Sequence, residues 1–288
     1  MLTTRIVGVI NLINGLVVQS IRFNEYLPIG KPEVAINYLD IWGADEIILL
    51  NINRQTKSKN SLIRNLLSYS KFCQTPLAVG GGIKSLRDIE LLIRNGADKV
   101  VINTNGHLNP NLFKEGAKEF GEQAIVASFD VKKIGKNFYA FINSGKVKLG
   151  MDLKDLLKQS IDNGAGEIFL NSIDRDGTKS GFDLELIKFV SENISIPLIG
   201  CGGAGKASDF IKAMPLKISG LAAGNIFNFS EHSVTKIKSI ILKKYKNIRL
   251  DTISNYQNKL FDSDGRLLPM NDKTLDKLRF DYIPKEKI

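Results

Sequence analysis

The segment Gly43-Ala44-Asp45-Glu46-Ile47 returns later in the chain as Gly164-Ala165-Gly166-Glu167-Ile168, and this repeat decides the fold. The stretch from Pro76 to Gly82, which ends in three glycines, returns in the same way from Pro197 to Gly203, which ends in two. Both pairs are about 121 positions apart. Because two separate motifs share one interval, the sequence predicts two copies of one half-structure, each with glycines at the ends of its strands.

Eight short apolar runs alternate with segments of helical periodicity, a pattern typical of parallel strands joined by crossover helices. Eight such units in 288 residues predict a TIM (β/α)8 barrel built from two half-barrels. An open doubly wound sheet is the alternative, but no GxGxxG motif follows the first strand to favour it. The expected strands are residues 5–10, 46–52, 76–80, 99–103, 124–130, 167–172, 196–201 and 219–224.

Three segments fall outside this regular plan. Residues 11–31 are expected to form a long loop after the first strand. Residues 138–147 suggest a small hairpin, because aromatic residues alternate there ahead of a Ser-Gly pair. Residues 1–250 would then form the barrel domain. Residues 251–288 are polar and charged, with one short helical pattern at 275–280, and we interpret them as an extension packed on the outside or partly disordered.

Composition narrows the class of protein. With 43% hydrophobic residues the chain can bury a substantial core, and it has no apolar run of 18 residues, so we expect no membrane span. Its first residues are too brief and poorly flanked for a signal peptide. Cys73 and Cys201, without a CxxC motif, provide neither a disulfide framework nor a zinc site and fit a reducing cytoplasm. We expect no metal ion and no cofactor.

The formal net charge is +10, from 40 basic and 30 acidic residues. The lysines are scattered through the helical segments and are not interleaved with aromatic residues, so a nucleic-acid partner is not expected. A solvated basic surface is the simplest explanation. An anionic small-molecule substrate would use part of this charge.

Glycines and small polar residues follow the strands in matched pairs. Gly81-Gly82 and Asn103-Thr104 follow the third and fourth strands, and Gly202-Gly203 and Gly224-Asn225 follow the seventh and eighth. Glycine lets the backbone approach an anion closely, and a following helix presents free N–H groups. Each half therefore predicts a phosphate-binding cup, although tight turns alone would also use these glycines. We add Gly177-Thr178, after the sixth strand, to the phosphate-binding candidates.

Two carboxylates are candidates for proton transfer. Asp130 ends the fifth strand, where a side chain points into the mouth of a barrel and can act as general acid or base. Asp176 lies in the loop after the sixth strand. A capping role for Asp130 and a loop-holding role for Asp176, which precedes a glycine, are the alternatives.

These motifs resemble those of the HisF family, whose members are the cyclase subunits of imidazole glycerol phosphate synthase. The strongest motif is Ser-Ile-Asp-Arg-Asp-Gly-Thr at 172–178, and the likeness covers residues 1 to about 250. The resemblance implies a TIM barrel paired with a HisH-like glutaminase. Ammonia released there would pass up through the barrel to a bis-phosphorylated substrate, which is cleaved and cyclised. The other matching segments are 80–83, 96–100, 164–168 and 202–205.

Several positions depart from the family pattern. The family's two catalytic carboxylates fall on Asn11 and Asp130, and an amide such as Asn11 cannot act as a general acid or base. The family's lysine after the first strand falls on Gln19, its aspartate ending the second strand on Asn51, and a phosphate-binding serine on Asn225. These four polar substitutions lie together at the mouth of the predicted barrel, and they suggest that the reaction there differs from that of the family.

The opposite end of the predicted barrel matches the family. Arg5, Glu46, Lys99 and Glu167 stand at the starts of the first, second, fourth and sixth strands, where two positive and two negative groups can close a ring of ion pairs. The resemblance implies that this ring gates the entrance of ammonia and that Asp98 faces the glutaminase. A salt-bridge plug that seals the barrel floor is the alternative.

A retained ammonia entrance with an altered acid–base pair resembles HisF-like paralogues that work with a HisH-like glutaminase and a sugar amidotransferase in surface-polysaccharide synthesis. Asn171 and Cys201 also look closer to that subgroup. We therefore expect a subunit that conducts ammonia for amidation or amidination of a sugar. An active histidine-pathway cyclase that tolerates Asn11, and a non-catalytic barrel that binds a phosphorylated ligand, are the alternatives.

Overall fold

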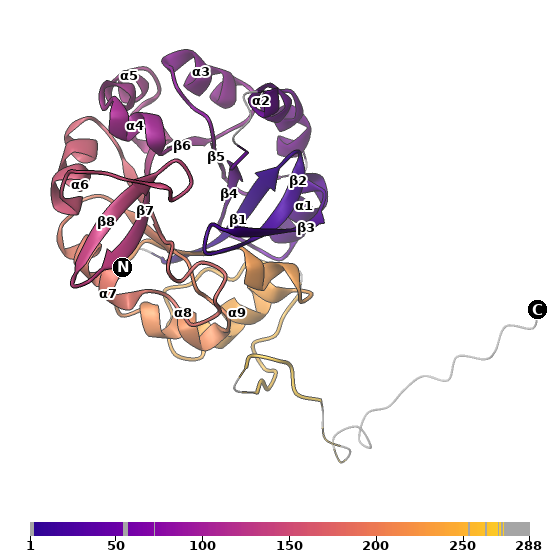
Figure 1. Ribbon diagram of the computed structural model, residues 1–288. Helices are drawn as coiled ribbons and strands as arrows, with labels where there is room; N and C mark the ends of the chain where they lie inside the picture. The colour runs from indigo at the N-terminus through magenta and orange to yellow at the C-terminus, as the bar shows by residue number, and fades with distance from the viewer. Residues whose placement is uncertain are drawn as a thin grey trace, which may run out of the picture.

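The computed structural model shows a closed barrel of eight parallel strands (Figure 1). β1 pairs with both β4 and β12, and β7 pairs with both β6 and β10, so the sheet has no free edge among these strands. The predicted TIM barrel is confirmed. Its strands are β1 (Arg5–Ile13), β4 (Glu46–Asn51), β5 (Leu77–Gly80), β6 (Lys99–Ile102), β7 (Ile125–Ile134), β10 (Glu167–Ser172), β11 (Leu198–Cys201) and β12 (Gly220–Ala223). The structure describes residues 3–53, 57–71, 73–252, 254–262, 264–269, 271 and 273.

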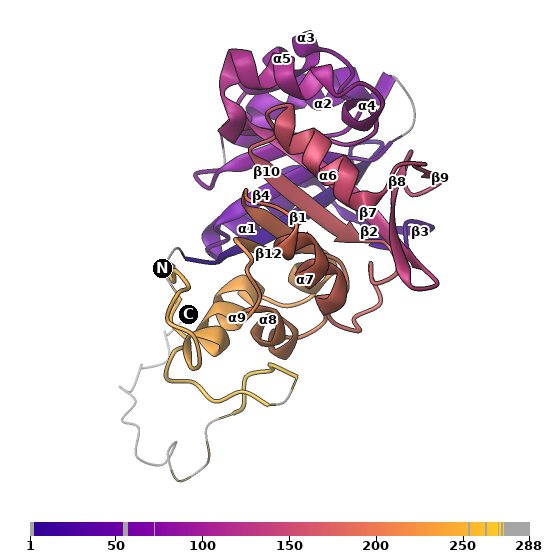
Figure 2. The same cartoon turned by 90° about the vertical axis from the view of Figure 1, so that its left-hand side faces the viewer.

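Helices surround the barrel, as both views show (Figure 2). Several begin at side-chain caps that the sequence encodes locally: Ser85 and Asp88 form a reciprocal capping box at α3, and Asp183 accepts the N–H of Leu186 at α7. The helices are α1 (Pro32–Ile41), α2 (Lys57–Ser70), α3 (Leu86–Arg94), α4 (Thr104–Leu108), α5 (Asn111–Phe120), α6 (Leu153–Asp162), α7 (Leu184–Glu192), α8 (Ala207–Ala213) and α9 (Ser233–Leu242).

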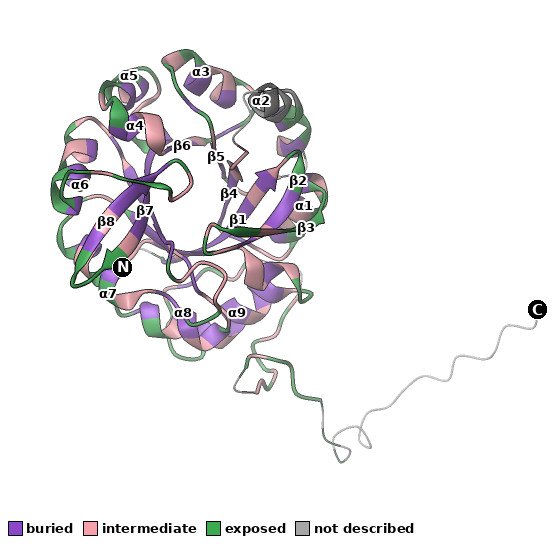
Figure 3. Ribbon diagram, viewed as in Figure 1, coloured by how far each residue is buried: buried purple, intermediate pink, exposed green. Residues whose placement is uncertain are grey.

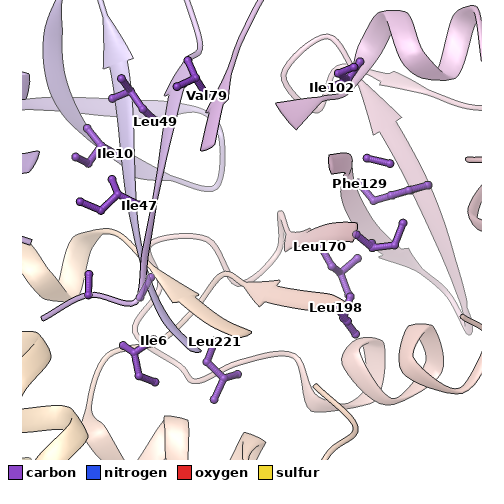
Figure 4. Close-up of a cluster of buried hydrophobic side chains, with 14 of the residues drawn as sticks. Ile6, Ile10, Ile47, Leu49, Val79, Ile102, Phe129, Leu170, Leu198 and Leu221 are labelled. Carbon is purple, nitrogen blue, oxygen red and sulfur yellow. The ribbon is translucent and has the colours of Figure 1, made fainter. Parts of the chain in front are cut away.

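Successive strand residues face two different cores because side chains alternate across a strand. Ile6 of β1 and Ile47 of β4 pack in the layer between barrel and helices (Figure 4). Their neighbours Val7 and Ile48 pack inside the barrel, in a small cluster that also contains Phe169 of β10. The strands of the barrel are largely buried, whereas the outer faces of the helices are exposed (Figure 3).

The segment predicted as a loop at 11–31 is instead a β-hairpin, so that expectation was wrong. β1 continues to Ile13, turns at Asn14-Gly15, and is followed by the antiparallel strands β2 (Leu16–Ile21) and β3 (Glu25–Gly30). Both turn residues have positive φ, 52° and 79°, which suits the two-residue hairpin turn. The sequence contained this turn signal.

The hairpin predicted at 138–147 is confirmed. β8 (Asn137–Ile142) pairs antiparallel with the extension of β7 and with the short β9 (Val147–Lys148). Both hairpins project from the barrel end where the strands finish (Figure 2). They therefore flank the mouth of the barrel.

Beyond α9 the chain passes the barrel floor and packs on its outside. The carbonyl of Asn247 accepts the N–H of Thr4 over 2.9 Å, and the Tyr256 hydroxyl lies 2.7 Å from His232 Nδ1. Thr252 packs so closely on Gly43 that a Cβ there would lie 2.2 Å from its methyl group. The helical pattern expected at 275–280 lies outside the described residues. Among the helices that the structure describes, none combines the length and apolar character needed to cross a membrane.

Candidate active site at the barrel mouth

A cavity of about 580 Å³ opens at the ends of the strands. Its floor and walls include Asn11 of β1, Asn51 of β4 and Asp130 of β7, together with Ser20 of β2 and Lys146 from the β8–β9 turn. Parallel strands bring their carboxyl ends to one face of a barrel, which is where TIM-barrel enzymes place their active sites. The predicted mouth residues from the first five barrel strands therefore meet in one space.

Asp130 is the carboxylate of this cavity. Its side chain is buried, and Asn103 Nδ2 donates to its Oδ2 over 2.8 Å. Burial raises the pKa of Asp130 to about 7, against the lowering effect of the Asn103 hydrogen bond and with a smaller contribution from Asp176. A carboxyl group with this pKa can both release and accept a proton near neutral pH. Asn11 shares the cavity but carries an amide.

Asp176 does not line this cavity. Its Oδ2 accepts the hydroxyl of Ser20 over 2.6 Å and the N–H of Phe23 over 3.3 Å, and its backbone carbonyl accepts the N–H of Arg22. Burial raises its pKa, while the bonds from Ser20 and Phe23 lower it. These contacts tie the loop after β10 to the β2–β3 hairpin, as the loop-holding alternative requires.

The first predicted phosphate cup faces the cavity. Gly81, Gly82, Asn103 and Thr104 all line it, and the exposed Lys84 stands beside the two glycines. Gly81 has φ of 112°, and a Cβ there would lie 2.1 Å from the carbonyl oxygen of residue 51, so only glycine fits. Backbone N–H groups together with a lysine suit a phosphate. Sequence reasoning missed Lys84, although it follows the glycines by two positions.

The second predicted cup differs from the first. Its candidates Gly202, Gly203, Gly224 and Asn225 do not line the cavity, and neither do Gly177 and Thr178. The loop after β10, which carries Gly177 and Thr178, packs on Gly203. A Cβ on Gly203 would lie 2.2 Å from the carbonyl oxygen of Gly181, and a Cβ on Gly177 would lie 2.3 Å from that of Ser20.

Polar groups of this second cup bond within the fold. Asn225 Nδ2 donates to the Ser20 carbonyl over 2.9 Å, and the Thr178 hydroxyl donates to the Arg175 carbonyl over 2.8 Å. Ser20 therefore links the hairpin to both Asp176 and Asn225. Sequence reasoning missed Ser20 because it lies on β2, a strand that was not predicted.

The four charged residues at the barrel floor form a closed ring. Arg5 contacts Glu46 and Glu167, and Lys99 Nζ bonds Glu46 over 3.0 Å and Glu167 over 2.7 Å. Both carboxylates are buried. Burial raises the pKa of Glu167, but Arg5 and Lys99 outweigh this and hold it below its ordinary value. For Glu46, burial prevails and the pKa lies above its ordinary value. We call these four residues the floor ring.

Asp98 lies beside the floor ring and is exposed. Its carboxylate accepts the N–H of Leu77 over 2.8 Å, just as Asp45 accepts the N–H of Ile6 over the same distance. Each aspartate therefore fixes the start of a neighbouring strand. The outer face of Asp98 stays available to a partner.

The sequence of the chain is similar to those of known proteins. The model of the family described as "Histidine biosynthesis protein" matches residues 5–233. Imidazole glycerol phosphate synthase subunit HisF of Dictyoglomus turgidum is 37% identical over 252 residues, which are 87% of this chain and the whole of that protein. The chain belongs to the HisF family.

Other HisF-family relatives are equally similar. Subunit HisF of Sulfolobus acidocaldarius is 38% identical over 251 residues, again 87% of this chain and the whole of that protein. A protein of Vibrio vulnificus whose name carries the designation hisF2 is 39% identical over 268 residues, covering 92% of this chain and 98% of that one. The family resemblance read from the motifs is confirmed.

Proposed function

We propose that this HisF-family protein is the synthase subunit of a glutamine amidotransferase complex. A HisH-like glutaminase would bind at the barrel floor, and ammonia would pass through the barrel to a phosphorylated small molecule at the mouth. The observation that supports this is the placement of two polar sites, the floor ring and the Asp130 cavity, at opposite ends of one apolar interior. Neutral ammonia enters such an interior at far lower cost than an ion does.

Within this function, the floor ring would act as the ammonia gate and Asp98 as a contact for the glutaminase. The first cup would hold one phosphate of the acceptor, with Gly81-Gly82, Asn103 and Thr104 as its ligands. The second cup, from Gly202-Gly203 and Gly224-Asn225, would hold a second phosphate once the loop at 173–183 moves. Gly177 and Thr178, on that loop, would take part in the same movement.

We further infer that the chain is a diverged paralogue that serves sugar amidation or amidination in surface-polysaccharide synthesis, with a sugar amidotransferase as a second partner. Asn11 and Asn51 support this, because both line the cavity where the resemblance places carboxylates. Among the described residues that line the cavity, Asp130 is the one carboxylate, and a single carboxylate does not provide the acid–base pair for cyclisation. The match to a relative designated hisF2 fits a second HisF-type gene.

Two alternatives have support of their own. An active cyclase of histidine biosynthesis is favoured by Asp130, whose pKa of about 7 suits proton transfer, and by relatives named as synthase subunits. A non-catalytic barrel that binds a phosphorylated ligand would need only the first cup. In both alternatives the barrel and its floor ring are the same.

A cyclase assay separates these functions. The purified chain is given the bis-phosphorylated substrate of the HisF family and free ammonium, which removes the need for a glutaminase, and loss of substrate is followed optically. We expect no turnover from folded protein that still binds the substrate. Clear turnover would establish a histidine-pathway cyclase and refute the argument from Asn11.

A further inference from the structure

One lysine is buried in the wall behind the barrel floor. Lys238 of α9 is 1% exposed, and of the lysines whose side chains the structure describes it alone is buried. It neither lines the mouth cavity nor belongs to the floor ring. Burial lowers the pKa of Lys238, and Asp45 opposes this by raising it. Withdrawing an ammonium group from water is costly, so its burial points to a role for the groups that it holds.

This ammonium group joins α9 to the turn that leads into β4. In the ring of helices, α9 lies next to α1 (Figure 1). Lys238 Nζ donates to the carbonyl of Gly43 over 2.6 Å and to Asp45 Oδ1 over 2.7 Å. On the preceding turn of α9, the Thr235 hydroxyl donates to the carbonyl of Trp42 over 2.8 Å. Hydrogen bonds from one helix therefore fix the turn from which β4 begins.

Asp45 carries this connection on to β1. Its second oxygen, Oδ2, accepts the N–H of Ile6 over 2.8 Å, and its own N–H donates to the Ile6 carbonyl over 2.9 Å. Arg5 precedes Ile6 in the chain and Glu46 follows Asp45, and these two charged residues contact each other in the floor ring. A chain of hydrogen bonds thus runs from Lys238 to the backbone that carries one edge of the floor ring.

Asp98 holds the start of another strand in the same way, but in a different environment. Like Asp45, it accepts a backbone N–H over 2.8 Å, in its case from Leu77. Asp98 is exposed to water, whereas the Asp45 side chain is 10% exposed. The Arg249 guanidinium lies 3.9 Å from Asp45 and is 68% exposed, so water screens that pair. Lys238 is therefore the close counter-charge that the buried Asp45 requires and that a solvated aspartate does not.

We propose that Lys238 is a positioning residue of the floor ring and that it acts through Asp45. By supplying the counter-charge, it keeps Asp45 bonded to β1 and so fixes how closely β1 and β4 stand where Arg5 meets Glu46. Its action is indirect, since the bonds that the structure describes for Lys238 go to Gly43 and Asp45. The role of the floor ring as a gate rests on the proposed function, but the positioning of the ring by Lys238 does not.

A double-mutant cycle in urea unfolding tests this on the full-length chain alone. Lys238→Met leaves Asp45 buried without its close counter-charge and should raise the unfolding equilibrium constant about a hundredfold or more. Combined with Arg5→Ala, its effect should fall short of the product of the two single effects by at least about fivefold, because both changes release the same edge of the ring. Lys236→Met, on the same helix but bonded to the loop before it, is the matched control, and its effect should multiply with that of Arg5→Ala.

Hydrogen exchange of the Ile6 amide provides a local measure. This N–H donates to Asp45, so Lys238→Met should speed its exchange about tenfold more than that of Val100, a buried residue of β6 that reports global opening. Where Lys238→Met does not fold, Asp45→Asn, which keeps the size of the side chain, takes its place in the cycle with Arg5→Ala.

The proposal is overturned if the effects of Lys238→Met and Arg5→Ala multiply as those of the control do. It is also overturned if exchange at Ile6 and Val100 rises equally, since that marks a lysine that stabilises the fold without positioning the ring. Neither measurement uses a glutaminase, ammonia or an acceptor. A chain that binds the glutaminase but gives a multiplicative cycle loses only this positioning, and a chain with the coupled cycle but no complex keeps it and loses the proposed function.

Discussion

Removing Arg5 from the floor ring tests whether these ion pairs hold the barrel floor together. Arg5 contacts both Glu46 and Glu167, whose side chains are 2% and 5% exposed, so Arg5→Ala leaves two buried carboxylates with Lys99 as their shared cation. Breaking a buried pair by removing one partner costs about 3–5 kcal/mol. Arg5 itself is 24% exposed, so water screens part of the interaction and we expect the lower end, about 3 kcal/mol.

The assay is equilibrium unfolding in urea at neutral pH, with thermal unfolding as a second measure. A loss of about 3 kcal/mol corresponds to a fall in Tm of roughly 6 °C or more for a chain of this size. The double variant Arg5→Ala/Glu46→Gln also removes the charge of the unpaired Glu46 carboxylate, so it should recover part of the lost stability. Arg94→Ala, which breaks an exposed pair with Glu90, is the matched control and should change stability by less than about 0.5 kcal/mol.

The pH dependence of this loss has a definite sign. Arg5 lowers the pKa of Glu46 in the intact ring, so its removal raises that pKa further above the unfolded value. A carboxyl group with a raised folded-state pKa favours folding when protonated and loses this contribution as the pH rises through that pKa. The deficit of Arg5→Ala should therefore shrink on acidification. A loss below about 1 kcal/mol at neutral pH, or one that grows on acidification, would refute the reasoning.

The remaining predictions concern the mouth and the path of ammonia. Asn11→Asp should raise any cyclase activity by about 10² or more, the usual worth of a positioned acid or base, and no gain would mean that Gln19 and Asn51 also block the chemistry. If Asp130 acts as a base, activity should rise with pH through about 7, the pKa set by its burial, and Asp130→Asn should remove both the activity and this rise. Gly81→Ala should destabilise the fold by several kcal/mol in urea unfolding, because its Cβ would lie 2.1 Å from a carbonyl oxygen, whereas Gly135→Ala, with open space around it, should cost about 1 kcal/mol. In the complex with a glutaminase, Arg5→Ala should uncouple glutamine hydrolysis from ammonia transfer, measured as the ratio of glutamate to product; unchanged coupling would make the floor ring a plug.

The barrel could be predicted from the sequence because its signals are local. Each strand is a short apolar run, and the repeated glycines mark where the strands of each half end. Strands β2 and β3 were not predicted, although Asn14-Gly15 signals the turn between β1 and β2, because the apolar residues of 11–31 were not interpreted as alternating strands. Ser20 and its bonds were missed for the same reason.

The site was harder to predict where it depends on residues far apart in the chain. Gly82 and Gly203 occupy equivalent places in the repeat. Gly82 lines the cavity, whereas Gly203 does not, because Gly181 packs on it. The pKa of Asp130 depends on its burial and on Asn103, which is 27 positions away. No pattern within one strand encodes such contacts.

Binding of a HisH-like glutaminase at the barrel floor is the most direct test of the central claim. Sedimentation of the full chain with the glutaminase of the same organism should show a one-to-one complex. Reversing the charge of Asp98 at the floor should weaken it by at least tenfold, whereas Asp130→Asn at the mouth should not affect it. Absence of a complex, or a complex that survives the Asp98 change and is lost on altering the mouth, would contradict a subunit that takes ammonia through its floor.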